Sequence, residues 1–168
     1  MKKLSLKLVC LLMLSLLFIQ CNKEKKEVTV GIDIPLTGSY AWWGNEFKEG
    51  VDIFSAKTPE LNVVFEDNHG KPNDAVASAN KLLNINKVDA LITLFAPFSF
   101  PIRDIAEKAK VPFISTFNSS TTFTQGYTYS YSDFTTNDTT LPLLVNFVTD
   151  SMKLSKGRSE ERRVGKEC

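Results

Sequence analysis

The 168-residue chain is poor in cysteine and histidine, and this scarcity limits the sites it can form. It has three cysteines, at positions 10, 21 and 168, and one histidine, His69. No cysteine spacing is typical of a metal site, and we expect no disulfide. His69 stands beside Gly70 and Pro72 in a turn sequence, where an exposed turn residue is expected rather than a base or a ligand. We therefore predict no metal and no cofactor.

The motifs of several enzyme classes are also missing from the sequence. There is no Gly-x-Ser-x-Gly elbow, no Cys/His pair and no phosphate-binding Gly-Lys-Ser loop. Glu66 and Asp67 are adjacent in a predicted strand, so their side chains point to opposite faces and do not form a catalytic pair. The net charge is +1 with no basic stripe, which argues against nucleic-acid binding. We predict a protein that is not an enzyme.

No apolar run is long enough for a membrane span, which needs about 20 residues. Residues 8–19 are apolar apart from Ser15 and follow Lys2, Lys3 and Lys7. This pattern fits the ~7–15-residue core of an export signal, and polar residues follow it at once. We predict a signal peptide over residues 1–20. The alternative is a short N-terminal membrane anchor.

Cys21 ends the apolar run at the position where a bacterial lipoprotein signal would be cleaved. The segment resembles a lipobox, although Gln20 stands where a small residue is usual. The resemblance implies that Cys21 is lipidated and that residues 21–27 form a charged tether. Two or more acyl chains on Cys21 would anchor the protein stably. The expected location is extracytoplasmic, in the periplasm or at the cell surface, with the lipid held in the membrane. The alternative is plain secretion with a free thiol.

Residues 158–168 have an unusual composition, with seven charged side chains in eleven residues. They are similar to the translation of a common sequencing-library adapter. We therefore expect this segment to be a non-native tail, and we expect the natural protein to continue beyond Gly157. The alternative is a solvated charged tail.

Short apolar runs alternate with helix-like segments through the middle of the chain. Strands are predicted over residues 28–36, 61–66, 88–95 and 111–115, and helices over 45–56, 73–84 and 101–110. This alternation is typical of an α/β fold with a parallel sheet flanked by helices. A flavodoxin-like strand order would place ligand loops after strands one, three and four, with a loop over residues 96–100 after strand three. A polar crossover follows over 116–140, with a short extended piece at 127–131, and helical spacing resumes over 141–152.

Several segments resemble periplasmic binding proteins of the branched-chain amino-acid type. They are Val-Thr-Val-Gly-Ile-Asp-Ile-Pro-Leu-Thr-Gly at 28–38, Phe-Glu-Asp-Asn-His-Gly-Lys-Pro at 65–72, Ala-Ser-Ala-Asn-Lys-Leu at 77–82, Lys-Val-Asp-Ala-Leu-Ile at 87–92 and Ile-Ala-Glu-Lys-Ala-Lys-Val-Pro-Phe-Ile-Ser at 105–115. The resemblance implies a type I fold of two α/β lobes that close on a small solute. Its implied partners are the solute and the permease and ATPase subunits of an ABC importer.

The resemblance also implies a division of the chain. Residues 28–120 would form the N-terminal ligand-binding lobe, 121–137 the hinge crossing, and 138–157 the first helix of a second lobe that is otherwise missing. We expect poor folding and weak ligand binding from such a fragment, because half of a two-lobe protein leaves apolar surface uncovered.

Three loops carry the ligand contacts that the resemblance implies. Their residues in this chain are Trp43 in the first loop, Pro97, Phe98 and Ser99 in the second, and Phe117, Asn118 and Ser119 in the third. In the second loop Ala96-Pro97-Phe98 replaces the small hydroxyl residues usual in the family. Phe95 and Phe113 are expected in the core, whereas Phe98 and Phe117 are expected at the ligand, which would then have an apolar portion.

Two other functions remain open from the sequence. The same fold also serves ligand-sensing domains that report to a receptor, because fold does not fix function. A hydrolase whose active groups lie outside this sequence is the third possibility.

Overall fold

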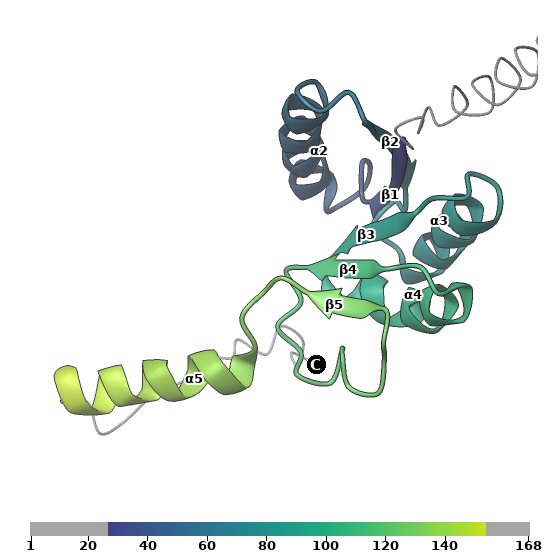
Figure 1. Cartoon of the computed structure of the whole chain (residues 1–168). Coiled ribbons are helices and arrows are strands. Elements are labelled where there is room, and N and C mark those ends of the chain that lie inside the picture. The colour runs from purple at the N-terminus through teal and green to yellow at the C-terminus, as the bar shows by residue number, and fades with distance from the viewer. Residues whose placement is uncertain (1–26, 154–168) are drawn as a thin grey trace, which may run out of the picture.

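The computed structural model describes residues 27–153, which form a five-stranded parallel sheet with helices on both faces (Figure 1). The strands are β1 (Val28–Ile34), β2 (Leu61–Asp67), β3 (Ala90–Leu94), β4 (Phe113–Thr116) and β5 (Ser130–Ser132). Their order is β2-β1-β3-β4-β5, and all four pairings are parallel. The predicted α/β fold class is confirmed, with β1 and β3 adjacent at the point where the strand order reverses.

Three helices cover the sheet: α2 (Ala41–Ser55) on one face, and α3 (Pro72–Asn84) and α4 (Ala96–Ala109) on the other (Figure 1). The sequence of α3 explains its limits. Pro72 stands in the first turn, where its missing N–H costs nothing. Asp74 lies in the first turn and Lys81 in the last, so both charges complement the helix dipole.

The apolar side chains form one core on each face of the sheet. Leu82, Leu91 and Phe113 are fully buried in the larger core, beneath α3 and α4. Ile32, Ile34 and Leu94 form the smaller core, and Phe47 and Val51 of α2 pack against it. Because consecutive strand residues point to opposite faces, Val30, Ile32 and Ile34 of β1 all point to the smaller core.

The predicted loop over residues 96–100 is wrong, because α4 already begins at Ala96. Phe95 has φ 64° and ψ 143°, a backbone conformation that turns the chain directly from β3 into the helix. Pro97 occupies the first turn, where proline is well accommodated. Pro101 was expected to start this helix, but it lies inside it. Likewise α2 begins at Ala41, four residues before the predicted start.

After β4 the chain crosses over and returns to the sheet as β5, which overlaps the predicted extended piece and begins three residues after its predicted start. Arg103 of α4 fastens this crossover: its guanidinium lies 3.9 Å from the centroid of the Tyr127 ring and donates to the Thr122 and Phe123 carbonyls. Glu107 accepts bonds from the backbone N–H groups of residues 128 and 129. These contacts hold the crossover on α4 in the segment that directly precedes β5.

The chain then leaves the sheet as α5 (Asn137–Asn146), which continues as the π-helical turn η1 (Phe147–Ser151) and projects away from the other elements (Figure 1). None of the residues in α5 and η1 is buried. Their exposed apolar side chains include Leu141, Leu143, Leu144, Val145 and Phe147, each more than half exposed.

Across residues 27–153, no helix is both long and apolar enough to cross a membrane. The predicted signal peptide, Cys21 and the tail over 158–168 lie outside the described residues.

Candidate functional site

Aromatic rings gather at the carboxyl-terminal edge of the sheet. We call Tyr40, Trp43, Phe95, Phe117 and Phe134 the aromatic surface. The Trp43 ring lies 6.0 Å from that of Phe95 and 5.9 Å from that of Phe117, and the Phe95 and Phe117 rings stack at 5.7 Å. Each of these three rings follows a different strand: β1, β3 and β4. The segments after these strands therefore meet on one side of the molecule, where parallel sheets bind ligands.

Much of the aromatic surface is open to solvent. Tyr40 and Phe117 are each 43% exposed, Trp43 is 45% exposed and Phe134 is 46% exposed. A contiguous apolar patch of this kind on a soluble domain marks an interaction site more often than packing alone. Tyr40 also contacts the Phe95 ring at 5.8 Å, and Phe134 contacts the Phe117 ring at 5.9 Å, so the rings form one continuous layer.

Two members of the layer have a strained backbone. Phe95 has φ 64° and Phe117 has φ 54°, values that bulky residues adopt rarely and at a cost of about 1–3 kcal/mol. The surrounding hydrogen bonds hold Phe95 there: its N–H donates to the Thr116 carbonyl at 2.8 Å, and its carbonyl accepts from the Ser99 hydroxyl at 2.7 Å. Such strain clusters at ligand sites.

Two of the predicted contact residues lie beneath the surface. Phe98 is 2% exposed, and its ring packs edge-on below those of Tyr40 and Phe95 at 5.6 and 6.2 Å. Ser99 is fully buried, and its hydroxyl also bonds to that of Ser115. The burial follows from α4 starting at Ala96, which turns both side chains inward. We assign them to the support of the surface, whereas Pro97 is exposed.

The third predicted loop divides in the same way. Phe117 joins the aromatic surface, while Asn118 is fully buried. The Asn118 side-chain oxygen accepts from the Ser120 N–H at 3.1 Å. The Asn118 backbone carbonyl accepts from the Ser132 hydroxyl at 2.8 Å. Ser119 is half-buried, and its carbonyl accepts from the Asn137 N–H. The Ser132 bond fastens the segment after β4 to β5, and the Asn137 bond fastens it to the start of α5.

Sequence reasoning missed Tyr40 and Phe134 and expected Phe95 only in the core. Phe113 is in the core as expected, but Phe95 both packs on the smaller core and joins the aromatic surface. The one signal for Tyr40 is its position three residues before Trp43, at the start of a helix. No local signal marks Phe134, because only the pairing of β5 with β4 brings it close.

A row of buried polar side chains crosses the sheet on the α3 and α4 face. Asp33, Thr93 and Ser115 are neighbours in register and are fully buried. Among residues 27–153, neither carboxyl oxygen of Asp33 has a hydrogen-bond partner. Burial raises the pKa of Asp33 to about 8; repulsion from Glu66 and Asp67 adds to the rise, and the polar groups of Asn68 and Thr93 oppose it. Asp33 is therefore neutral at pH 7.

A second polar region lies at the edge of the sheet, between β2 and α3. A cavity of about 300 Å³ is lined by Glu66, Asp67, His69, Asp74, Ala77, Ser78 and Lys81. Lys81 pairs with Glu66 at 2.7 Å, and His69 lies 3.5 Å from Asp67 and 3.3 Å from Asp74. No group of three or more His, Cys, Asp or Glu side chains in the described part of the chain is arranged to hold a metal.

Comparison with solved structures identifies this fold. The chain is 23% identical to the leucine-binding protein LivK of Thermotoga maritima, with a TM-score of 0.69, covering 75% of this chain and 38% of that one. It is 20% identical to the branched-chain amino acid transporter substrate-binding protein LivJ of Streptococcus pneumoniae, solved with isoleucine, with a TM-score of 0.69, covering 76% and 39%. A solute-binding protein of an ABC transporter from Rhodopseudomonas palustris, solved with 3,4-dihydroxybenzoic acid, is 20% identical, with a TM-score of 0.68, covering 74% and 36%.

The chain thus spans less than two fifths of the length of these structures. No match was found among curated protein sequences. The family profile described as "Periplasmic binding protein" matches residues 27–156, which is most of the chain. The fold is one lobe of the type I periplasmic-binding-protein architecture, and the chain belongs to the periplasmic binding protein family.

Proposed function

We propose that this chain supplies the N-terminal lobe of an extracytoplasmic solute-binding protein of an ABC importer. The observation that carries the proposal is the convergence of Trp43, Phe95 and Phe117 into one half-open aromatic layer at the carboxyl ends of parallel strands. This layer is one wall of the solute site, and a second lobe supplies the opposite wall. The protein binds its solute without changing it and delivers it to permease and ATPase partners.

The solute has an apolar or aromatic portion. Trp43, Phe95 and Phe117 offer ring faces and edges, and a stacked ligand would cover roughly 150–250 Å² of aromatic surface. At about 25 cal/mol per Å², this burial is worth roughly 4–6 kcal/mol before the costs of binding. Two structurally similar proteins were solved with isoleucine and with 3,4-dihydroxybenzoic acid, which both have an apolar portion. These two compounds are suitable first probes.

The remaining elements fit the same proposal. Residues 121–137, including β5, form the crossing between the lobes, and residues 138–157 begin the second lobe. The exposed apolar side chains of α5 support this assignment, because such a helix needs a covering element. The signal over 1–20, the lipidated Cys21 and the tether over 21–27 would hold the protein outside the cytoplasm.

Trp43→Ala is expected to weaken solute binding by about 10–100-fold, because it removes the ring at the centre of the aromatic wall. Trp42→Ala is the matched control: Trp42 is the neighbouring tryptophan, 64% exposed, with Trp43 as its ring contact. Isothermal titration with isoleucine and with 3,4-dihydroxybenzoate measures the affinity of both variants, each made in the natural protein that we expect to continue beyond Gly157. Equal affinity of Trp43→Ala and the parent protein for a probe that the parent binds would contradict the proposed wall. Recovery of the probe unchanged separates a binding protein from a hydrolase.

A further inference from the structure

We propose that Asp67 is a positioning residue that holds the segment between β1 and α2 in place, and thereby fixes Tyr40 and Trp43 on the aromatic surface. The inference rests on the proposed function, since it assigns a role in the same ligand wall. Asp67 is the last residue of β2 and lies outside the three segments that form the surface. Its contacts with the first of those segments are described below.

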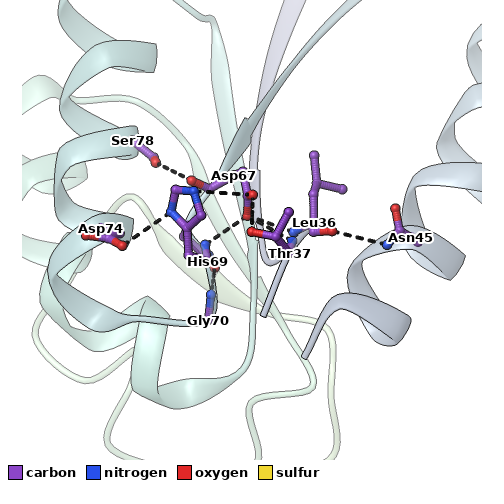
Figure 2. A network of polar contacts seen from close by, with 9 residues as sticks. Leu36, Thr37, Asn45, Asp67, His69, Gly70, Asp74 and Ser78 are labelled. Carbon is purple, nitrogen blue, oxygen red and sulfur yellow. Dashed lines mark hydrogen bonds and ion pairs between the residues drawn. The ribbon is translucent and has the colours of Figure 1, made fainter. Parts of the chain in front are cut away.

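The Asp67 carboxylate bonds directly to the residues that follow β1 (Figure 2). One oxygen, Oδ1, accepts from the backbone N–H of Leu36 at 2.9 Å and from that of Thr37 at 3.2 Å. The other, Oδ2, accepts from the Thr37 hydroxyl at 2.6 Å. Three donors from two consecutive residues thus converge on one ionised group, and such charge-assisted bonds are stronger than neutral ones.

The same carboxylate is fastened on its own side of the molecule. Oδ1 accepts from the His69 N–H at 2.8 Å, and the Asp67 carbonyl accepts from the Ser78 hydroxyl of α3 at 3.4 Å. Burial alone would raise the pKa of Asp67, but the hydrogen bonds from Thr37, His69 and Leu36 outweigh it and lower the pKa. Asp67 is therefore ionised at neutral pH and bridges two turns that are far apart in the sequence.

Close packing between the two turns leaves little room for movement. Gly38 has φ 82°, and a Cβ there would lie 2.6 Å from the His69 carbonyl oxygen. A Cβ on Gly70 would lie 3.0 Å from the Tyr40 ring, so that ring rests against the turn after β2. Both glycines are needed for this approach, since a side chain would separate the turns.

The segment held by Asp67 is in turn bonded to the start of α2. The Asn45 side-chain amide donates to the Leu36 carbonyl at 3.3 Å (Figure 2). It also donates to the Ala41 carbonyl at 2.7 Å. Trp43 lies between Ala41 and Asn45. The contacts therefore run from Asp67 through Leu36 and Asn45 to the helical turn that carries Trp43.

The test uses tryptophan fluorescence, because the chain has two tryptophans and Trp42→Phe leaves Trp43 as the only one. In this background, Asp67→Asn is expected to raise acrylamide quenching of Trp43 at least twofold in the absence of any solute. Thr37→Val is expected to have a smaller effect in the same direction, because it removes one of the three donors and keeps the side-chain size. If Asp67→Asn does not fold, Thr37→Val carries the test alone.

Asp74→Asn is the matched control, since Asp74 contacts His69 at 3.3 Å from α3 and is not among the groups bonded to residues 36 and 37. It should leave Trp43 quenching at the parent value. A general loss of stability is detected by the urea midpoint of each variant, with quenching measured in buffer where each variant is folded. Folded Asp67→Asn and Thr37→Val chains with parental quenching would overturn the proposal.

Solute binding separates this proposal from the proposed function. With isoleucine or 3,4-dihydroxybenzoate as the probe, Asp67→Asn is expected to bind at least fivefold more weakly than the uninterrupted parent protein. Raised quenching together with a parent that binds no solute would leave the positioning of Trp43 standing and reject the proposed function. A parent that binds a probe, with Asp67→Asn binding it equally well, would reject the positioning role and leave the proposed function standing.

Discussion

Asp33→Asn is expected to stabilise the fold at pH 8 and to remove most of its pH dependence between pH 4 and pH 8. The Asp33 side chain is fully buried and its pKa is about 8 in the folded chain, against an ordinary value of 3.8. Between these values, the folded chain keeps a proton that the unfolded chain has lost. The contribution of Asp33 to the stability of the fold is therefore complete below pH 3.8 and falls as the pH rises toward 8.

The size of this effect follows from linkage. Between the two pKa values the unfolding free energy falls by about 1.4 kcal/mol per pH unit. Over an interval of roughly four units, the total loss due to Asp33 is at most about 6 kcal/mol. Asparagine keeps the volume of the side chain but has no proton to lose, so its unfolding free energy should lack this slope. Urea unfolding at several pH values measures the difference between variant and parent. Asp133→Asn, at an exposed position, is the control and should follow the parent. Parallel stability curves for Asp33→Asn and the parent would contradict the prediction.

Gly44→Ala is expected to destabilise the fold by at least about 3 kcal/mol, at the upper end of the usual cost of overpacking. A Cβ at position 44 would lie 2.0 Å from the Pro35 carbonyl oxygen and 2.7 Å from its carbon, and both are backbone atoms. The clash can be relieved only if α2 moves away from the end of β1. Because Gly44 follows Trp43 directly, that movement would also displace the aromatic surface.

Gly50→Ala provides a matched comparison in the same helix. A Cβ at position 50 would have no atom within 4 Å, so alanine adds helix propensity without a clash. It is expected to stabilise the chain by up to about 1 kcal/mol. Thermal and urea unfolding of the two variants should therefore move in opposite directions. A Gly44→Ala chain as stable as Gly50→Ala would mean that α2 does not pack on β1 as described.

The strands and their parallel pairing could be predicted because they follow from patterns within short windows. The run around Leu91 is nearly all apolar, as a strand buried between helices requires, and the helices between the strands dictate parallel pairing. The helix starts were less predictable, since Pro97 and Pro101 are both acceptable first-turn residues. The choice depends on the positive φ of Phe95, which its neighbours in space impose.

The candidate site was predicted less well than the fold. The resemblance gave Trp43 and Phe117, which do meet, but their contact with a solute stays a prediction. Ser99 was expected to face the ligand, and only the start of α4 shows why it is buried. Asp67 has no sequence signal for its role, because its partners at positions 36 and 37 lie about thirty residues earlier.

The positive φ of Phe95 and of Phe117 has a consequence for anyone who wishes to change the specificity of this protein. Valine, isoleucine and threonine are poorly tolerated at such φ values, whereas glycine adopts them readily. A library for directed evolution should therefore vary Tyr40, Trp43 and Phe134 freely and restrict positions 95 and 117 to unbranched side chains. Shape can be redesigned at three places in this wall, but at the other two the main chain limits the choice.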